Sequence, residues 1–147
     1  MGNIEPDPKN IKVEVHLQKS SLYFRQGIRS ALFEIGAENV QQAKKFIYNP
    51  PKTGRLYKDY KRGGFHQASK GGESPAHWYG GLQRNMGYVV RGSYEVEFYS
   101  NVYYANWLEE GTKKMQPRPY IIRTVNKMKY KNQRTMEDCV GIRINKV

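Results

Sequence analysis

Residues 24–47, FRQGIRSALFEIGAENVQQAKKFI, repeat apolar side chains at intervals of three and four residues over about seven turns of a helix. The apolar positions form one stripe: Phe24, Ile28, Ala31, Leu32, Ile35, Val40, Ala43 and Ile47. Gly27 and Gly36 lie within this segment, and a glycine costs about 1 kcal/mol relative to alanine in a helix interior. A helix that tolerates this cost needs tertiary packing. We therefore predict that other elements cover the stripe and that Gly36 marks a bend or a close approach.

Both ends of this helix carry local signals. Ser20 or Ser21 can accept the first free amide protons of the helix. Pro50 and Pro51 disfavour helical backbone just before them, which predicts that the helix ends at Asn49.

The segment upstream of the helix has a different period. Residues 11–17, IKVEVHL, alternate apolar and polar side chains, which predicts a half-buried strand. Pro6 and Pro8 precede this strand, so we predict an irregular N-terminal arm over residues 1–10.

The second half of the chain alternates short elements with turns. The predicted elements are a hairpin of residues 84–91 and 94–100, a short helix over 103–110 closed by Gly111, a helix over 119–134 with Ile122, Val125 and Met128 inward, and a last strand over 140–144. The sequence thus predicts one α+β domain over residues 1–147. Its mainly antiparallel sheet of about four strands is packed by the long N-terminal helix, with a second helix near the C-terminus.

Charge is distributed unevenly along the chain. The net charge of +12 comes from two basic blocks, residues 44–91 and 112–134, while residues 92–111 contain only acidic charges. Two kinds of partner suit such blocks: nucleic acid and an acidic protein surface.

Residues 50–75 show almost no apolar periodicity and are predicted to form an extended basic loop. Bases alternate there with Tyr57, Tyr60 and Phe65, a composition found on surfaces that follow phosphates and stack bases. The candidate contact residues are Lys52, Arg55, Lys58, Lys61, Arg62 and Lys70. Three interpretations stay open: an arm that docks on a neighbouring protein, a surface that faces nucleic acid, and a solvated loop. With few apolar anchors, the loop is expected to become ordered only on a partner.

Other chemistry finds little support in the sequence. The three histidines and Cys139 show no metal-ligand spacing, and no cofactor motif is present. Glu109 and Glu110 are neighbours on a short helix and point apart, so they do not form an acid–base pair. No apolar run approaches the length of about 20 residues that a membrane-spanning helix needs. We expect neither an enzyme nor a membrane protein.

Three segments together resemble a family of tailed phages (siphoviruses), the neck, head–tail joining or tail-completion proteins. Its Pro-x-x-Thr-Gly-Arg-Leu motif matches residues 50–56 through Thr53, Gly54, Arg55 and Leu56. Its Gly-Glu-x-Pro-Ala segment matches residues 72–76, and its Tyr-Ala to Arg-Pro-aromatic signature matches Tyr104, Ala105, Glu109, Gly111, Thr112, Arg118, Pro119 and Tyr120. Tyr103 stands where the family commonly has proline, and Glu110 where it commonly has an aromatic residue.

The resemblance implies a structural role in the virion, assembled in the host cytoplasm. The expected function is to join or close the tail at the DNA channel as a homo-oligomeric ring. Its partners would be copies of itself, neighbouring head-closure and tail proteins and the DNA backbone in the channel. The alternative is a cytoplasmic, prophage-borne nucleic-acid-binding protein that uses the basic loop. We also expect Glu109 and Arg118 to form an ion pair that ties the short helix to the next one.

Overall fold

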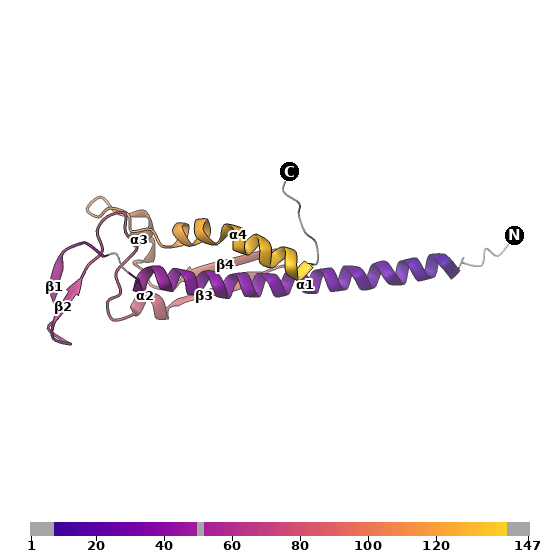
Figure 1. Ribbon diagram of the computed structural model, residues 1–147, viewed down its shortest axis with the longest axis horizontal. Helices are drawn as coiled ribbons and strands as arrows, with labels where there is room; N and C mark the ends of the chain where they lie inside the picture. Colours follow the sequence, from indigo (N-terminus) through magenta and orange to yellow (C-terminus); the bar gives the residue numbers. More distant parts are fainter. Residues whose placement is uncertain (1–7, 50–51, 141–147) are drawn as a thin grey trace.

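A computed structural model of the chain describes residues 8–49 and 52–140, and for residues 8–21 it describes the course of the backbone only. The elements are α1 (Pro8–Tyr48), β1 (Leu56–Lys58), β2 (Phe65–Gln67), α2 (Gly81–Arg84), β3 (Met86–Arg91), β4 (Glu95–Ser100), α3 (Ala105–Glu110) and α4 (Ile121–Val140). This mixture of helices and antiparallel strands confirms the α+β class. Figure 1 shows an elongated molecule in which α4 and the β3–β4 pair lie along α1, while β1 and β2 extend at the opposite end from the N-terminus.

Helix α1 is longer than the sequence pattern predicted. It begins at Pro8, so the predicted strand over residues 11–17 is wrong, and so is the predicted irregular structure of residues 8–10. Residues 1–7, the rest of the predicted arm, lie outside the described residues. The alternation of four apolar residues is a weak local preference. Because no glycine or proline stands between Pro8 and Gly27, a helix started downstream can propagate through this segment.

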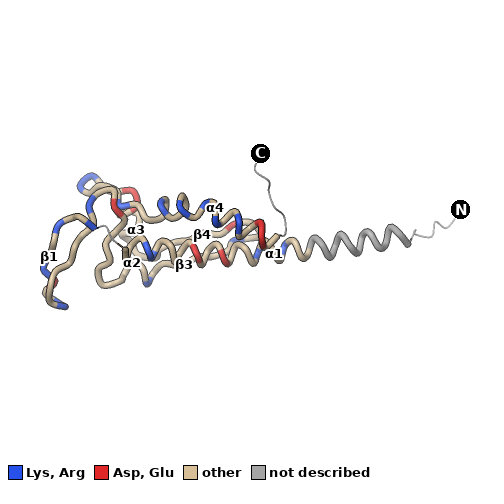
Figure 2. Tube along the Cα trace, in the orientation of Figure 1, with Lys and Arg blue, Asp and Glu red and all other residues tan. Residues whose placement is uncertain are grey.

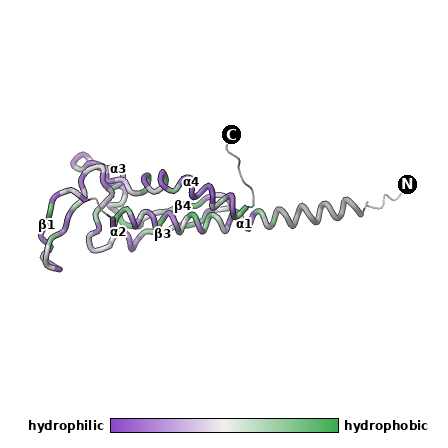
Figure 3. Tube along the Cα trace, in the orientation of Figure 1, coloured by the Kyte–Doolittle hydropathy of each residue, from purple (hydrophilic) through white to green (hydrophobic). Residues whose placement is uncertain are grey.

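The helical stripe forms one side of the core, as predicted. Ile28, Ala31, Leu32, Ile35, Val40, Ala43 and Ile47 are buried, whereas Phe24 at its N-terminal end is 43% exposed. Helix α1 packs against α4 and against both strands of the β3–β4 pair. A Cβ atom on Gly36 would collide with the ring of Tyr88 from β3, which confirms the predicted close approach. Figure 3 shows hydrophobic and hydrophilic residues alternating along α1, as expected for a helix with one covered face.

The four strands form two separate antiparallel pairs rather than one sheet. The β3–β4 hairpin was predicted, and its register places Tyr88 opposite Phe98 and Val90 opposite Val96. The β1–β2 pair was not predicted and lies inside the segment that was expected to be an extended loop. The predicted last strand begins at Val140, which ends α4, and residues 141–144 lie outside the described part of the chain.

Helix α4 turns a different face inward than its apolar residues suggested. Thr124 and Met128 are buried, while Ile122 is 53% and Val125 is 42% exposed. The predicted inward position is therefore right for Met128 and wrong for Ile122 and Val125. The hydroxyl of Thr124 donates to the carbonyl oxygen of Tyr120 at 2.7 Å, so this polar residue is buried with its hydrogen bond made.

Polar contacts fix the position of α4 on α1. The amide of Asn39 donates to the side-chain oxygen of Asn132 at 3.0 Å, and Lys131 lies 2.6 Å from Glu38. Asn39 is buried, and its amide also donates to the carbonyl oxygen of Ile35 at 2.7 Å, so the bond to Asn132 gives this buried group a second partner in the observed register of the two helices.

Gly27 is predicted to be required where α1 crosses the end of α4. A Cβ atom there would collide with the carbonyl oxygen of Cys139, a backbone atom that cannot rotate away. Gly27→Ala should therefore lower the free energy of unfolding by about 1–3 kcal/mol, although alanine favours a helix. Urea denaturation measures the change, with Ser30→Ala on the exposed face of α1 as the control. A stabilised Gly27→Ala variant would contradict this packing.

Candidate functional site at the β1–β2 end

The signature segment of the sequence builds a tight corner between α3 and α4. The carboxylate of Glu109 accepts three hydrogen bonds, from the backbone amides of Tyr120 (2.9 Å), Ile121 (3.0 Å) and Ile122 (2.9 Å). These amides form the first turn of α4, where no carbonyl oxygen of the helix can reach them. A carboxylate at this position also interacts favourably with the positive end of the helix dipole.

The expected ion pair between Glu109 and Arg118 is wrong. Glu109 is occupied by the three amides, and Arg118 instead donates from Nη1 to the sulfur of Met115 at 2.7 Å. The backbone of Arg118 still closes the corner, because its amide donates to the carbonyl oxygen of Leu108 at 2.6 Å. The sequence spacing suggested that the two residues lie near each other. It did not reveal that the backbone amides at the start of α4 compete with Arg118 for the carboxylate of Glu109.

Gly111 ends α3 as predicted. Its φ of 79° lies in the region that favours glycine, and a Cβ atom would lie 2.7 Å from the carbonyl oxygen of Met115. Thr112 and Met115 then form a backbone bridge that returns the chain toward α4. Tyr120, at the end of this return, is fully buried, and burial raises the pKa of its hydroxyl to about 12.

The three segments that carry the family resemblance are joined by hydrogen bonds. Glu73 accepts from the backbone amides of Thr53 (3.0 Å) and Lys70 (2.7 Å), and the hydroxyl of Thr53 also donates to it. The amide of Gly72 donates to the carbonyl oxygen of Pro117 at 2.8 Å, and the hydroxyl of Ser74 to that of Pro119 at 2.9 Å. Residues 53, 72–74 and 117–119 therefore meet in one structural unit.

Lys52 is committed to this unit and is not a free partner contact. Its ammonium group donates to the carbonyl oxygens of Phe46 (2.9 Å) and Ser74 (2.8 Å), and burial lowers its pKa. Lys70 is exposed and donates its backbone amide to Glu73. The other four candidate residues, Arg55, Lys58, Lys61 and Arg62, lie on the β1–β2 hairpin, where Figure 2 shows basic residues gathered.

The hairpin is anchored to the rest of the molecule through Asp59. Its buried carboxylate accepts hydrogen bonds from the amides of Lys61 (3.0 Å) and Arg62 (3.2 Å) and from the hydroxyl of Tyr79 at 2.6 Å. The bond to Tyr79 is the main cause that holds the pKa of Asp59 below its ordinary value. The segment therefore contains anchors that its composition did not reveal.

Each of the four exposed hairpin cations lies over an aromatic ring. Arg55 lies 5.5 Å from the centroid of Tyr57, Lys58 lies 5.4 Å from that of Tyr60, and Lys61 and Arg62 lie 5.8 and 4.8 Å from that of Tyr79. Within the described residues, none of the four cations forms an ion pair with a carboxylate. Their charge is therefore available to an anionic partner.

Beside the hairpin, four rings form what we call the aromatic cluster: Tyr57, His66, Trp78 and Tyr79. Trp78 is stacked with His66 at a centroid distance of 4.4 Å and lies nearly parallel to Tyr57 (6.3 Å) and Tyr79 (5.6 Å). Burial lowers the pKa of His66 even though the charge of Asp59 acts in the opposite direction, so this ring is neutral at neutral pH. Trp78 keeps 46% of its surface exposed.

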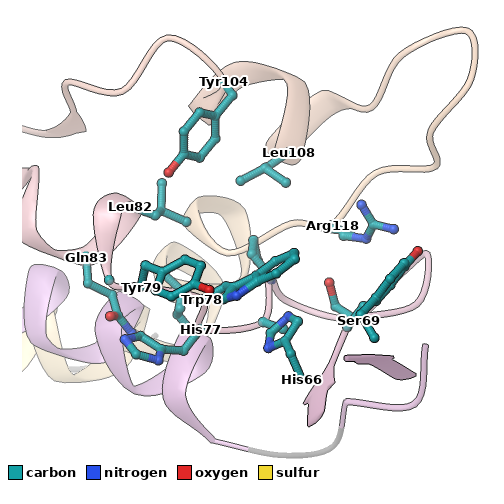
Figure 4. Close-up of a pocket in the computed structure, with 16 residues that line it drawn as sticks. His66, Ser69, His77, Trp78, Tyr79, Leu82, Gln83, Tyr104, Leu108 and Arg118 are labelled. Atoms are coloured by element: carbon teal, nitrogen blue, oxygen red, sulfur yellow. The ribbon is translucent and has the colours of Figure 1, made fainter. Parts of the chain in front are cut away.

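The aromatic cluster lines an open cavity of about 670 Å³, a volume within the range of small-molecule sites. Figure 4 shows Trp78 lying across the middle of the view, with Gln83 toward one side and Arg118 toward the other. The lining residues come from α1, the β1–β2 hairpin, residues 75–83 and the α3–α4 corner. A second hollow of about 320 Å³ shares four of these residues and adds Lys44, Tyr48, Arg62 and Arg84.

Two polar groups on the cavity wall have no hydrogen-bond partner among the described residues. They are the side-chain amide of Gln83, at both its nitrogen and its oxygen, and Nε of Arg118. Gln83 is only 4% exposed, so its unpaired amide is a buried polar group. Sequence reasoning missed Trp78, Tyr79 and Gln83; the only signal was their position between the Gly-Glu-x-Pro-Ala match and the predicted hairpin.

The described residues contain no group of three or more histidine, cysteine, aspartate or glutamate side chains that could hold a metal ion. None of the helices, over the residues described, is long and apolar enough to cross a membrane. Comparisons with protein-family models, with curated proteins and with solved structures found no match.

Glu109→Ala should destabilise the protein by about 1–2 kcal/mol, because three helix amides lose their acceptor. The neighbouring Glu110 is exposed and makes none of these bonds, so Glu110→Ala should change the free energy of unfolding by less than about 0.5 kcal/mol. Urea denaturation of both variants measures the difference. Equal effects of the two substitutions would show that Glu109 does not cap α4.

Glu73 should make the stability depend on acid pH. Hydrogen bonds, chiefly from the Thr53 hydroxyl, lower its pKa from 4.5 to about 2 in the folded protein. Since the folded pKa is the lower one, the stabilisation is complete above pH about 4.5 and is lost as the pH falls toward 2. The stability difference between the wild type and Glu73→Gln should shrink over this range in urea titrations at stepped pH. A difference that is constant with pH would contradict the assignment.

Proposed function

We propose that the protein is a structural component of the head–tail junction of a tailed phage, where it joins or closes the tail as part of a homo-oligomeric ring around the DNA channel. The observation that supports this most is the union of the three motif segments. Residues 53, 72–74 and 117–119 are far apart in the sequence and are hydrogen-bonded to one another. The resemblance therefore falls on one connected unit rather than on scattered residues.

The chemistry of that unit also favours a structural role. Glu73 within the unit and Glu109 in the adjoining α3–α4 corner each accept three hydrogen bonds from neighbouring groups. Carboxylates satisfied in this way hold backbone in place and are poorly suited to exchange protons with a substrate. The unit thus stabilises a shape, which is what a ring component supplies.

An exposed aromatic patch beside the unit is a candidate contact with a neighbouring subunit. Tyr103 is 81% and Trp107 is 51% exposed, and their rings lie 5.6 Å apart in an edge-to-face arrangement. Tyrosine and tryptophan are enriched at the centres of protein interfaces. Tyr103 also occupies a position where the family commonly has proline, so this contact would be specific to this chain.

A second candidate function is binding of nucleic acid through the β1–β2 hairpin, outside any virion. The four exposed cations of the hairpin, Arg55, Lys58, Lys61 and Arg62, favour it because no carboxylate among the described residues pairs with them. In a ring, the same cations would meet the DNA backbone in the channel or an acidic face of a neighbouring protein.

The purified chain is expected to be a monomer of 17.1 kDa or a weak oligomer, and to form rings with its neighbours in the particle. Tyr103→Ser combined with Trp107→Ser should prevent ring formation and leave the monomer folded. Tyr94→Ser, at an exposed tyrosine in the β3–β4 turn, is the matched control. Light scattering and negative-stain imaging of the chain with its neighbours provide the measurement. Complete particles without density for this chain at the junction would refute the proposal.

A further inference from the structure

The cavity beside Trp78 is built differently from a void left by imperfect packing. Its wall combines aromatic rings with the buried amide of Gln83, whose donor and acceptor are both unpaired among the described residues. An unmade hydrogen bond at a buried group opposes folding, so folding alone gives no reason to place glutamine there. A ligand that enters the cavity and offers both a donor and an acceptor would recover this cost once the side chain turned toward it.

The rings around the cavity specify the shape of that ligand. Trp78, His66 and Tyr57 are nearly parallel, with interplanar angles of 18° and 25° to Trp78. Trp78 is about half exposed, which leaves ring surface for a further flat group. A planar heteroaromatic ring would stack there, and its polar edge would suit the amide of Gln83.

Positive charges at the two sides of the cavity indicate that the planar ligand carries anionic groups. On the Gln83 side, the adjoining hollow is lined by Lys44, Arg62 and Arg84. On the other side lies Arg118, whose Nε is unpaired and which has no carboxylate partner among the described residues. A flat ring with an anionic group toward each side is the form of an internal nucleotide in a single strand, which has a phosphate before it and after it.

We propose that this cavity binds an unpaired base of a single-stranded nucleic acid, with the base stacked on Trp78, its edge hydrogen-bonded to Gln83, and the flanking phosphates at Arg62 and Arg118. A free nucleotide shares this chemistry but has one phosphate end, so it would use only one of the two cationic sides. The inference does not rest on ring formation, because every residue of the site belongs to one chain.

Fluorescence of Trp78 tests the proposal directly. The chain has two tryptophans, so Trp107→Phe leaves Trp78 as the only one. A short single-stranded oligonucleotide of mixed sequence should quench its emission. An abasic strand with the same number of phosphates should bind about tenfold more weakly or worse, because stacking is lost. Equal binding of the abasic strand, or of a duplex of the same length, would overturn the proposal.

Matched variants separate the contributions of the site. Trp78→Ala and Gln83→Leu should each weaken binding of the oligonucleotide by about fivefold or more, whereas Trp107→Ala should not. Gln83→Leu should leave the melting temperature unchanged or higher, because it removes a buried amide that has no partner. Unchanged affinity of a folded Gln83→Leu or Trp78→Ala variant would overturn the assignment of these residues.

The salt dependence of binding tests the phosphate contacts. A comparison of the oligonucleotide with a nucleoside monophosphate tests whether the ligand is a strand or a free nucleotide. Arg62→Gln should reduce the slope of log affinity against log salt by about 0.7, and Lys129→Gln on exposed α4 should not. A nucleoside monophosphate should bind at least about tenfold more weakly than the strand. Equal affinities for the nucleoside monophosphate and the strand would overturn the proposal of a single-stranded ligand and assign the cavity to free nucleotides. A chain that forms rings but binds no oligonucleotide would refute this inference and leave the proposed function standing.

Discussion

The arrangement of the β1–β2 end of the molecule depends on the hydrogen bonds that the carboxylate of Glu109 accepts. By accepting hydrogen bonds from the backbone amides of Tyr120, Ile121 and Ile122, this carboxylate joins the end of α3 to the start of α4 across the corner, the connection of residues 111–120. The direction in which α4 leaves this corner lets Thr124 and Met128 reach the core that α1 provides. The same corner carries Arg118 to the wall of the cavity. One helix cap therefore sets both the packing of the body and the position of a cation at the candidate site.

The local pattern of the sequence predicted those elements whose stability is local. The apolar stripe from Ile28 to Ile47, the β3–β4 hairpin and the glycine that ends α3 all agree with the structure. The strand predicted over residues 11–17 is wrong because alternation over seven residues competes with a helix that is already nucleated downstream. The inward face of α4 differs from the predicted one. Thr124 can be buried there because its hydroxyl donates a hydrogen bond to the carbonyl oxygen of Tyr120.

The candidate site was predictable only in part, because long-range contacts create it. The hairpin cations were visible as a run of bases between tyrosines, but Lys52 belongs to the fold through two carbonyl oxygens that the sequence places 6 and 22 residues away. Asp59 appeared as one acid in a basic loop, and its bond to Tyr79 orders the hairpin tip. No local sequence pattern distinguishes Gln83. It stands out only because its buried side-chain amide has no hydrogen-bond partner among the described residues. Composition thus predicted the charge of the site, whereas contacts between distant segments determine its shape.

Among the described residues, some buried polar groups have a hydrogen-bond partner and others have none. At the α1–α4 contact, Asn39 and Thr124 have hydrogen-bond partners, which makes those groups contribute to a unique packing. At the cavity, Gln83 and Nε of Arg118 have none among the described residues. Tyr79, in the same region, adopts a φ of 57°, which is rare for a residue with a side chain. Unpaired groups and strained backbone both oppose folding. Gln83, Nε of Arg118 and the strained Tyr79 lie near the cations, whereas two further unpaired groups, Oε2 of Glu38 and the hydroxyl of Tyr120, lie at the α1–α4 contact and in the core. Because a small domain has only about 5–15 kcal/mol of stability to lose, such costs persist only where the surrounding contacts outweigh them.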